Sequence, residues 1–210
     1  SGNGPGSLPY CDKIIRATLQ MRGLIDGMMS FARLGRKGMA VELVDMASLV
    51  DEVVATLSID TGLKKMRWHI QPGLPAVQGD PVLLREVWVN LLENAAKYTP
   101  EGSAIHLTAR ERSDAVCLFV DDHGPGLPKG HEARVFEKFE RGQRESATPG
   151  VGLGLAICRA IVEAHGGTIE GHTREHEGSV QGARFVIALP RGTPPADLGE
   201  PATPPETTSP

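Results

Sequence analysis

The sequence predicts one compact domain that mixes helices and strands, with a single helix before it and a polar tail after it. Two observations carry this prediction. Apolar residues recur at helical spacing in some stretches and alternate with polar residues, as in half-buried strands, in others. The 210 residues are 40% hydrophobic, which is enough for one core, and Leu, Val, Ile and Ala must fill it because aromatic residues make up only 4%.

Residues 1–8 are rich in Gly and Ser and predict a flexible leader. Residues 9–36 predict a helix whose seam alternates spacings of three and four, as in a helical bundle. The seam consists of Ile14, Thr18, Met21, Ile25, Met28 and Ala32. One such helix cannot bury its seam alone, so dimerisation is the simplest expectation, and packing on the following domain is the alternative.

The domain itself is expected over residues 41–190. Its first half predicts a strand at 41–45, a helix at 46–57, a strand at 66–70 and a turn at 72–75. The next helix begins at Asp80, a suitable N-cap, with Pro81 at its first position, and Thr99 with Pro100 ends it.

The second half predicts strands at 104–110 and 115–120, which are expected to pair antiparallel because they follow one another closely. Residues 131–149 form a polar connection with one short apolar helix around residues 135–139, and a connection of this length indicates a lid or disorder. A helix at 156–164 and strands at 168–172 and 183–189 close the domain. Residues 191–210 are rich in Pro and Thr and predict a disordered tail.

Composition excludes several classes of function. The net charge of −4 and the lack of a long basic run argue against a nucleic-acid partner. No apolar stretch approaches the roughly 18 residues of a membrane helix, and no signal peptide is expected. Cys117 and Cys158 lie in apolar runs, and with Cys11 they make an odd number, which favours buried free thiols in a reducing compartment. We therefore expect a cytoplasmic domain, which can still belong to a membrane-bound protein.

The helix that begins at Asp80 carries the first candidate site. Asn90, Asn94 and Lys97 form a row along the flank of its apolar stripe. A carboxamide offers a neutral oxygen to Mg²⁺, and a lysine offers a charge to phosphate. The alternative is that this row is the half-exposed edge of an ordinary core helix.

The second candidate follows the strand at 115–120. Asp122 is followed by Gly124 and Gly126, and such a turn lets the backbone approach a flat ligand closely. A buried carboxylate there can accept a hydrogen bond from the exocyclic amine of adenine. The alternative is an ordinary hairpin loop.

The third candidate is a glycine-rich turn that runs directly into the helix at 156–164. Its residues are Gly150, Gly152, Leu153, Gly154 and Leu155. Free N–H groups at a helix start can cradle phosphate, and Arg141 and Arg144 of the preceding connection can close over it. The pattern is neither a Walker A sequence nor a Rossmann fingerprint.

In order and spacing, these motifs resemble the N, G1, F and G2 boxes of sensor histidine kinases. The motifs are Asn90-x3-Asn94-x2-Lys97-Tyr98, Asp122-x-Gly124-x-Gly126, Phe136-x2-Phe139-x-Arg141 and Gly150-x-Gly152-Leu153-Gly154-Leu155. The resemblance covers residues 41–190. Residues 21–34 also resemble the second helix of the family's dimerisation and phosphoacceptor bundle, and residues 139–167 resemble the potassium-responsive sensor kinases of the Kdp system.

The resemblance implies an α/β sandwich: a mixed, mostly antiparallel sheet covered on one face by helices, with ATP between the helices and a lid. It implies that Asn94 holds Mg²⁺ and that Asp122 binds the adenine amine. Asn90, Lys97 and Arg141 would serve the phosphates and the catalysed transfer, and Tyr98 would form a wall of the site. The other expected nucleotide-binding residues are Gly124, Gly126, Phe139, Gly150, Gly152, Leu153, Gly154 and Leu155.

Two departures from the family pattern matter. His123 stands where the family often has Asn, and its side chain is expected to face solvent or touch the lid. The phosphoacceptor histidine, which the family carries on the first bundle helix, has no good match among the seven histidines. The chain is therefore expected to bind ATP and Mg²⁺ and to phosphorylate a histidine outside it, with a response regulator as the final acceptor and a homodimer as the full-length form.

Two other functions remain open at this stage. One is an ATP hydrolase like the gyrase and mismatch-repair enzymes, but these carry a glutamate where Asn90 stands, and a carboxamide cannot take a proton from water. The other is a non-catalytic ATP-binding regulatory module. The intact boxes argue against such degeneration.

Overall fold

The computed structural model describes residues 39–59, 66–130, 132–138 and 152–191. In chain order, the elements are β1 (Glu42–Val44), α2 (Met46–Ile59), β2 (Arg67–Ile70), β3 (Val77–Gly79), α3 (Pro81–Tyr98), β4 (Ala104–Glu111), β5 (Ala115–Asp121), the 3-10 helix η1 (Arg134–Phe136), α4 (Gly154–Ala164), β6 (Thr168–His176) and β7 (Ser179–Pro190). The expected leader, bundle helix and tail lie outside the described residues, so those expectations stay predictions.

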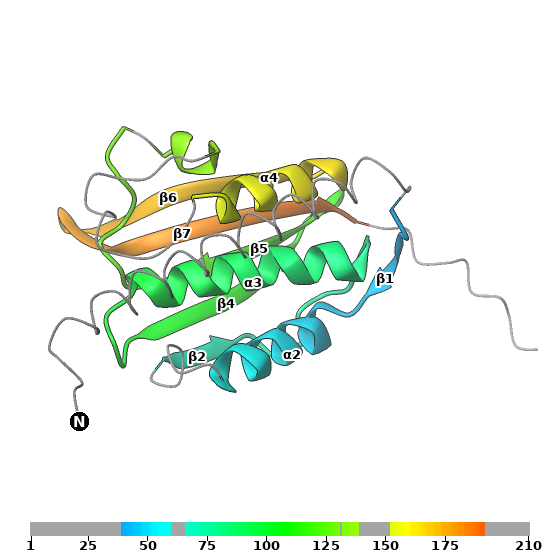
Figure 1. Cartoon of the computed structure of the whole chain (residues 1–210), viewed down its shortest axis with the longest axis horizontal. Helices are drawn as coiled ribbons and strands as arrows, with labels where there is room; N and C mark the ends of the chain where they lie inside the picture. Colours follow the sequence, from blue (N-terminus) through cyan, green and yellow to red (C-terminus); the bar gives the residue numbers. More distant parts are fainter. Residues whose placement is uncertain (1–38, 60–65, 131, 139–151, 192–210) are drawn as a thin grey trace, which may run out of the picture.

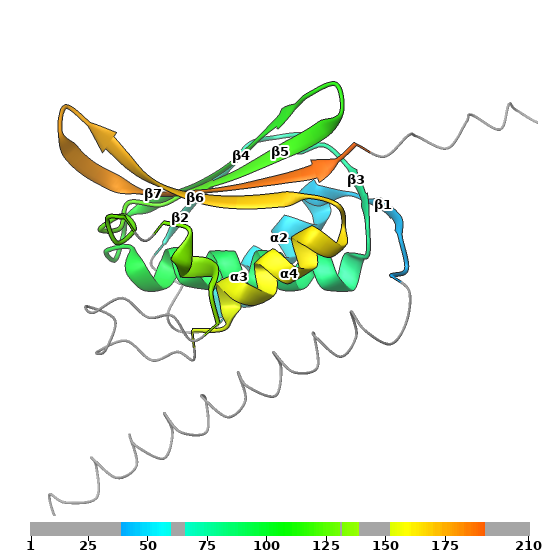
Figure 2. The same cartoon turned by 90° about the horizontal axis from the view of Figure 1, so that it is seen from above.

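The main sheet has five strands in the order β2-β4-β5-β7-β6. All neighbouring pairs are antiparallel except β2 with β4. Helices α2, α3 and α4 lie together on one face of this sheet, and β1 and β3 form a separate two-stranded ribbon beside it (Figures 1 and 2). The expected α/β sandwich, with a mostly antiparallel sheet and helices on one face, is confirmed.

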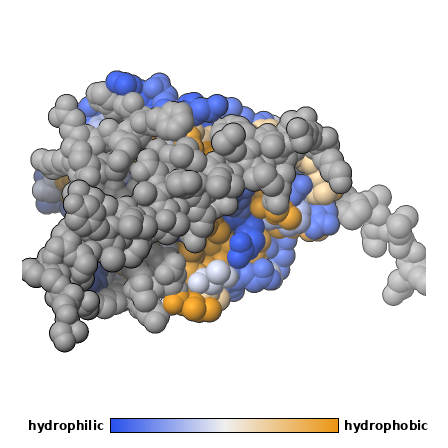
Figure 3. Space-filling view, viewed as in Figure 1, coloured by the Kyte–Doolittle hydropathy of each residue, from blue (hydrophilic) through white to orange (hydrophobic). Residues whose placement is uncertain are grey.

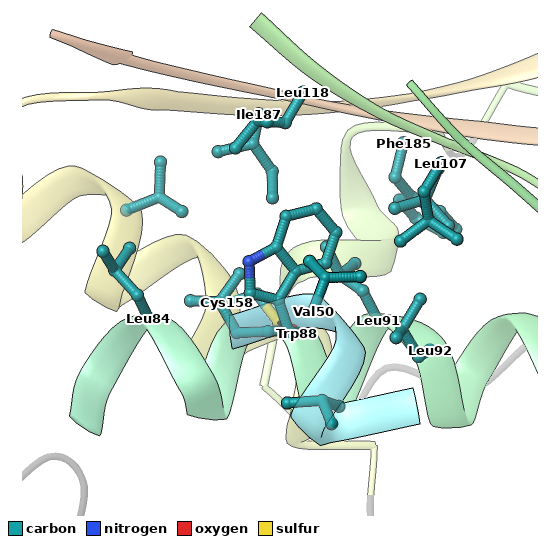
Figure 4. Close-up of a cluster of buried hydrophobic side chains, with 14 of the residues drawn as sticks. Val50, Leu84, Trp88, Leu91, Leu92, Leu107, Leu118, Cys158, Phe185 and Ile187 are labelled. Carbon is teal, nitrogen blue, oxygen red and sulfur yellow. Dashed lines mark hydrogen bonds between the residues drawn. The ribbon is translucent and has the colours of Figure 1, made fainter. Parts of the chain in front are cut away.

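The core lies between the sheet and the three helices because the strands alternate. On β4, Ile105 and Leu107 are fully buried, whereas His106 between them is half-buried. Trp88 extends from α3 toward the sheet and approaches Leu118 and Ile187 (Figure 4). Its indole N–H donates to the Met46 sulfur at 3.4 Å, so this large ring is buried without an unpaired donor.

Helix α3 begins and ends where the sequence predicts. The Asp80 carboxylate accepts the N–H groups of Val82 and Leu83 at 3.0 and 3.2 Å, and Thr99 N–H closes the last turn on Ala95 O at 3.0 Å. His165, at the end of α4, accepts Asp80 N–H through Nε2 at 3.0 Å. The two helices that carry candidate residues are therefore joined at one end by a hydrogen bond.

The structure differs from the sequence prediction in four elements. β3 was not expected, and β6 and β7 are longer than predicted because they continue to a turn at Glu177 and Gly178. The short helix expected around residues 135–139 is a single 3-10 turn at Arg134–Phe136 in the described residues.

The described surface fits the composition. Cys117 and Cys158 are free and buried, as expected. No helix among the described residues is long and apolar enough to cross a membrane. In the space-filling view, hydrophobic colour on the visible described surface is confined to small patches among hydrophilic residues (Figure 3).

Leu91→Ala is expected to destabilise the domain by about 3 kcal/mol, because Leu91 is fully buried and its loss leaves a cavity between α3 and the sheet. Chemical denaturation measures this change. Val82→Ala on the same helix is the control: Val82 is 56% exposed, so its truncation should cost less than about 0.5 kcal/mol. Equal losses in the two variants would contradict the proposed position of the core.

Candidate functional site

Two segments that are distant in sequence, the start of α4 and the turn after β5, pack against α3 and form with it the junction that holds the candidate residues. A Cβ placed on Gly154, at the start of α4, would lie 2.6 Å from Asn90 Oδ1 and 3.6 Å from Asn94 Nδ2. A Cβ placed on Gly124, in the turn after β5, would lie 2.9 Å from the backbone oxygen of Tyr98. Glycine at both positions therefore lets the turn and the start of α4 pack directly against α3.

The row on α3 lies at this junction. Asn90, Asn94 and Lys97 are half-buried. Asn90 Nδ2 donates to Glu86 O at 2.9 Å, which leaves its Oδ1 beside Gly154 as an acceptor. An acceptor suits a cation or its bound water better than a phosphate oxygen. Lys97 Nζ lies 4.8 Å from the centre of the Tyr98 ring.

Asp122 is the most buried acidic residue at the junction, with 3% of its surface exposed. Its Oδ1 accepts the N–H groups of Gly124 and Ala183 at 2.8 and 2.9 Å. None of the described residues donates a hydrogen bond to Oδ2. Burial raises the pKa of the Asp122 carboxyl, while the two backbone donors, Arg174 and His123 oppose that rise. One carboxylate oxygen is thus held in place and the other remains available to an amine donor.

The rest of the turn packs against β6. Gly126 has a φ of +75°, and a Cβ there would lie 2.7 Å from Thr173 Cγ2. Leu127 N–H donates to Thr173 Oγ1 at 3.0 Å. The glycine spacing that the sequence assigned to ligand approach at Gly126 therefore also serves close packing between this turn and the β6–β7 hairpin.

The start of α4 offers backbone donors. Its N-cap residue, Leu153, makes no side-chain cap hydrogen bond, so the first N–H groups of the helix receive no acceptor from it. Gly152 has a φ of +73°, which glycine adopts without strain. Leu155 is half-buried on the first turn. Phe139, Arg141, Arg144 and Gly150 lie outside the described residues.

The donor set around the junction restricts the kind of metal site. Among the residues that the structure describes, no three His, Cys, Asp or Glu side chains gather as metal ligands. A magnesium ion here would depend on the Asn94 carboxamide oxygen, water and phosphate oxygens, and magnesium accepts such a shell.

Two contacts of the turn were not found from the sequence. His123 Nδ1 lies 2.8 Å from Ala104 O, and because a carbonyl oxygen only accepts, Nδ1 carries the proton. His123 was expected to face solvent or touch the lid; its half-buried ring also ties the turn to β4. Arg174 Nη1 donates to the backbone oxygen of Asp122 at 2.8 Å. Arg174 lies in no apolar pattern or glycine motif, and although His123 lies inside the turn motif, no local signal indicates its contact with Ala104.

The fold is an α/β sandwich that carries a buried carboxylate in the turn after β5 and a helix start without a side-chain cap at α4. Residues 79–193, more than half of the chain, match the family described as histidine kinase-, DNA gyrase B-, and HSP90-like ATPase. The chain belongs to this family.

Its relatives are sensor kinases, which confirms the resemblance stated above. The sensor protein KdpD of Escherichia coli (strain K12) is 39% identical over 186 residues, which cover 87% of this chain and 20% of that protein. The adaptive-response sensory kinase SasA of Nostoc sp. is 39% identical over 131 residues, 62% of this chain and 32% of that protein. The chain therefore spans a third or less of the length of these two relatives.

Solved structures agree with the sequence relatives. The mycobacterial sensor histidine kinase MprB matches with a TM-score of 0.65 and 29% identity over 73% of this chain and 100% of that chain. Full-length ShkA, solved in complex with AMPPNP, matches with a TM-score of 0.65 and 31% identity over 81% of this chain and 36% of that chain.

Asp122→Asn is expected to keep the fold and lose ATP binding. The amide oxygen can still accept from Gly124 and Ala183, and no charge is buried, so the Tm should equal or exceed that of the wild type. The amide nitrogen replaces Oδ2 and cannot accept from an amine, so ATP affinity should fall by more than about tenfold. Thermal denaturation and titration calorimetry measure the two effects. Unchanged affinity would remove Asp122 from the site.

Gly154→Ala is expected to weaken ATP binding by about tenfold or more, because the new methyl group displaces Asn90 from the junction. Titration calorimetry provides the readout. Gly102→Ala is the control: its φ of +77° makes alanine strained there, but nothing lies within 4 Å, so stability should fall without loss of affinity. A similar loss of affinity in both variants would refute a local effect.

Proposed function

We propose that this chain is the ATP-binding catalytic part of a two-component sensor histidine kinase. It transfers the γ-phosphate of ATP to a histidine on a helical bundle, from which a response regulator receives it. The observation that carries the proposal is that α3 packs against the start of α4 at Asn90 and Asn94, and against the turn that follows Asp122 at Tyr98. Family membership and the sensor-kinase relatives support it.

In this proposal, the base and the phosphates of ATP bind to different parts of the junction. At the base end, Asp122 Oδ2 accepts the exocyclic amine of adenine beside the wall that Tyr98 provides. At the phosphate end, the N–H groups at the start of α4 and the Lys97 ammonium neutralise the charge of the phosphate oxygens. Asn94 would hold Mg²⁺, with Asn90 next to it, and the ion would supply positive charge to the phosphates. Phe139, Arg141 and Gly150 keep the roles that the motif resemblance implies for them.

Phosphoryl transfer mainly requires positioning and charge neutralisation. A histidine nitrogen attacks the γ-phosphorus, the bond to the bridging oxygen breaks, and ADP leaves with that oxygen. His69 and His106 occupy strand positions that alternate with core residues, and His165 is hydrogen-bonded between α3 and α4. These three histidines have structural surroundings, and we infer that the acceptor comes from a bundle outside the described residues.

An ATP hydrolase is the second candidate, since the family includes ATPases. Hydrolysis needs a base that takes a proton from the attacking water. Asn90, a carboxamide, stands where the motif resemblance implies a glutamate in the hydrolases, and a carboxamide cannot take that proton. A non-catalytic regulatory module is the third candidate, and it would bind ATP without transfer.

The properties of the whole protein are also proposals, because the chain spans only 20% of KdpD. We infer a homodimer, a cytoplasmic location for this part, where ATP and reduced thiols occur, and a response regulator as partner. Potassium as the signal is supported by the similarity to KdpD alone, and it would be sensed by parts of the protein outside this chain.

The test combines the 210-residue chain with a separately expressed phosphoacceptor bundle and radiolabelled ATP. Labelled histidine is the expected result. Asn94→Ala should remove the magnesium dependence of ATP binding and lower transfer by at least about tenfold. Glu93→Gln is the matched control, because it changes the exposed residue next to Asn94 on α3. This variant should transfer phosphate to the bundle at the wild-type rate.

The other outcomes separate the candidates. Magnesium-dependent ATP binding without labelled histidine would favour the regulatory module. Steady ATP hydrolysis without the bundle would favour the hydrolase. Binding that neither Asn94→Ala nor Asp122→Ala alters would reject the site.

A further inference from the structure

The ladder between β5 and β7 changes its pattern at Asp122. Asp121 is the partner of Arg184, so the next pair is Asp122 with Ala183. Asp122 N–H donates to Ala183 O at 3.0 Å, as in a regular antiparallel ladder. Ala183 N–H, however, donates to the Asp122 side chain at Oδ1, at 2.9 Å. The backbone oxygen of Asp122 therefore needs another donor.

Arg174 provides this donor from the next strand. It is the register partner of Gly182, and a bulge follows it, between Arg174 and Glu175. Gly182 has a φ of +133°, and a Cβ there would collide with the backbone oxygen of Asp122. The missing side chain lets the guanidinium reach across β7 and donate to that oxygen at 2.8 Å.

We infer that Arg174 is a positioning residue for adenine recognition: by binding the backbone oxygen of Asp122, it keeps the Asp122 carboxylate in the ladder and Oδ2 turned to the base. Without this donor, the backbone oxygen competes with Oδ1 for Ala183 N–H, and the carboxylate loses its fixed orientation. This inference rests on the proposed function.

Charge supports the same role. The charged and titratable groups that act on the Asp122 carboxyl are Arg174 on β6 and His123 in its own turn, and both oppose the rise of its pKa that burial causes. Asp121, one residue earlier, is paired with Arg184 instead, with both contacts at 2.6 Å. Adenine presents an amine to the carboxylate, whereas guanine presents an oxygen at that position. Discrimination between adenine and guanine therefore requires a carboxylate that is both ionised and correctly oriented.

The experiment measures ATP and GTP binding to the 210-residue chain by titration calorimetry across mildly acidic to neutral pH. Arg174→Met should weaken ATP binding by about tenfold and reduce the preference for ATP over GTP. Because loss of the guanidinium raises the pKa of Asp122 further, ATP binding should fail at a higher pH than in the wild type as the solution is acidified.

Two further variants separate the hydrogen bond from the charge. Arg174→Gln keeps an N–H donor for the backbone oxygen without the charge, so it should stay folded and still show the shift in pH profile. Arg174→Lys keeps both the N–H donor and the positive charge, so its ATP affinity and pH profile should be closest to those of the wild type. Arg184→Met is the matched control, since it removes an arginine from β7 whose partner is Asp121, and it should leave affinity and pH profile unchanged.

A lower Tm in Arg174→Met and Arg174→Gln with wild-type selectivity and pH profile would mean a purely structural role and would overturn the inference. That result is distinct from failure of the proposed function. If Asp122→Asn loses ATP binding while the Arg174 variants bind as the wild type does, only the inference fails. If Asp122→Asn itself binds normally, the site assignment fails.

Discussion

The hydrogen bond from Ala183 N–H to the Asp122 carboxylate connects the sheet to the candidate site. In a regular ladder this N–H would go to a backbone oxygen. Here Oδ1 of the Asp122 carboxylate accepts this hydrogen bond instead. The bond fixes the orientation of the side chain and leaves Oδ2 for a ligand. Because the carboxylate takes this N–H, the backbone oxygen of Asp122 accepts from Arg174 instead. Residue 182 must then be glycine, since a Cβ there would collide with that backbone oxygen.

The one-sided sheet explains why two successive aspartates have opposite surroundings. Strand alternation sends Asp121 to the face without helices, where it pairs with Arg184, and that pairing raises the pKa of the arginine. On the same face, the guanidinium groups of Arg110 and Arg184 lie 5.9 and 5.5 Å from the centre of the Phe119 ring. Asp122 lies at the helix-covered junction instead, where burial dominates its titration.

Much of the fold was predictable because its signals are local. Helix α3 is bounded by Asp80, Pro81 and Thr99, and capping chemistry acts within a few residues. β3 was missed because three residues form a strand only through their partner β1. The strand order, the parallel pairing of β2 with β4 and the length of the polar β6–β7 hairpin depend on distant contacts, which periodicity does not report.

The same distinction applies to the candidate site. Asn90, Asn94, Asp122 and the glycines stand out in the sequence because their spacing belongs to one helix or one turn. The contacts of Arg174 and His123 do not, since these side chains bind the backbone oxygens of residues 52 and 19 positions away. A backbone acceptor leaves no trace in residue identity, so such contacts become visible only in the structure.

The pairing of β5 with β7 also has a kinetic meaning. β4–β5 and β6–β7 are hairpins between neighbours in the chain, but β5–β7 joins Ala115 to Pro190 and closes a long loop. Contacts of this range form late in folding because loop closure costs entropy. Asp122 lies at the end of the β5–β7 pairing, so the proposed adenine site is complete only when these two strands have paired. ATP at a hundred times its Kd would then raise the free energy of unfolding by about 2.7 kcal/mol. The ligand would stabilise the domain only after β5 and β7 have paired.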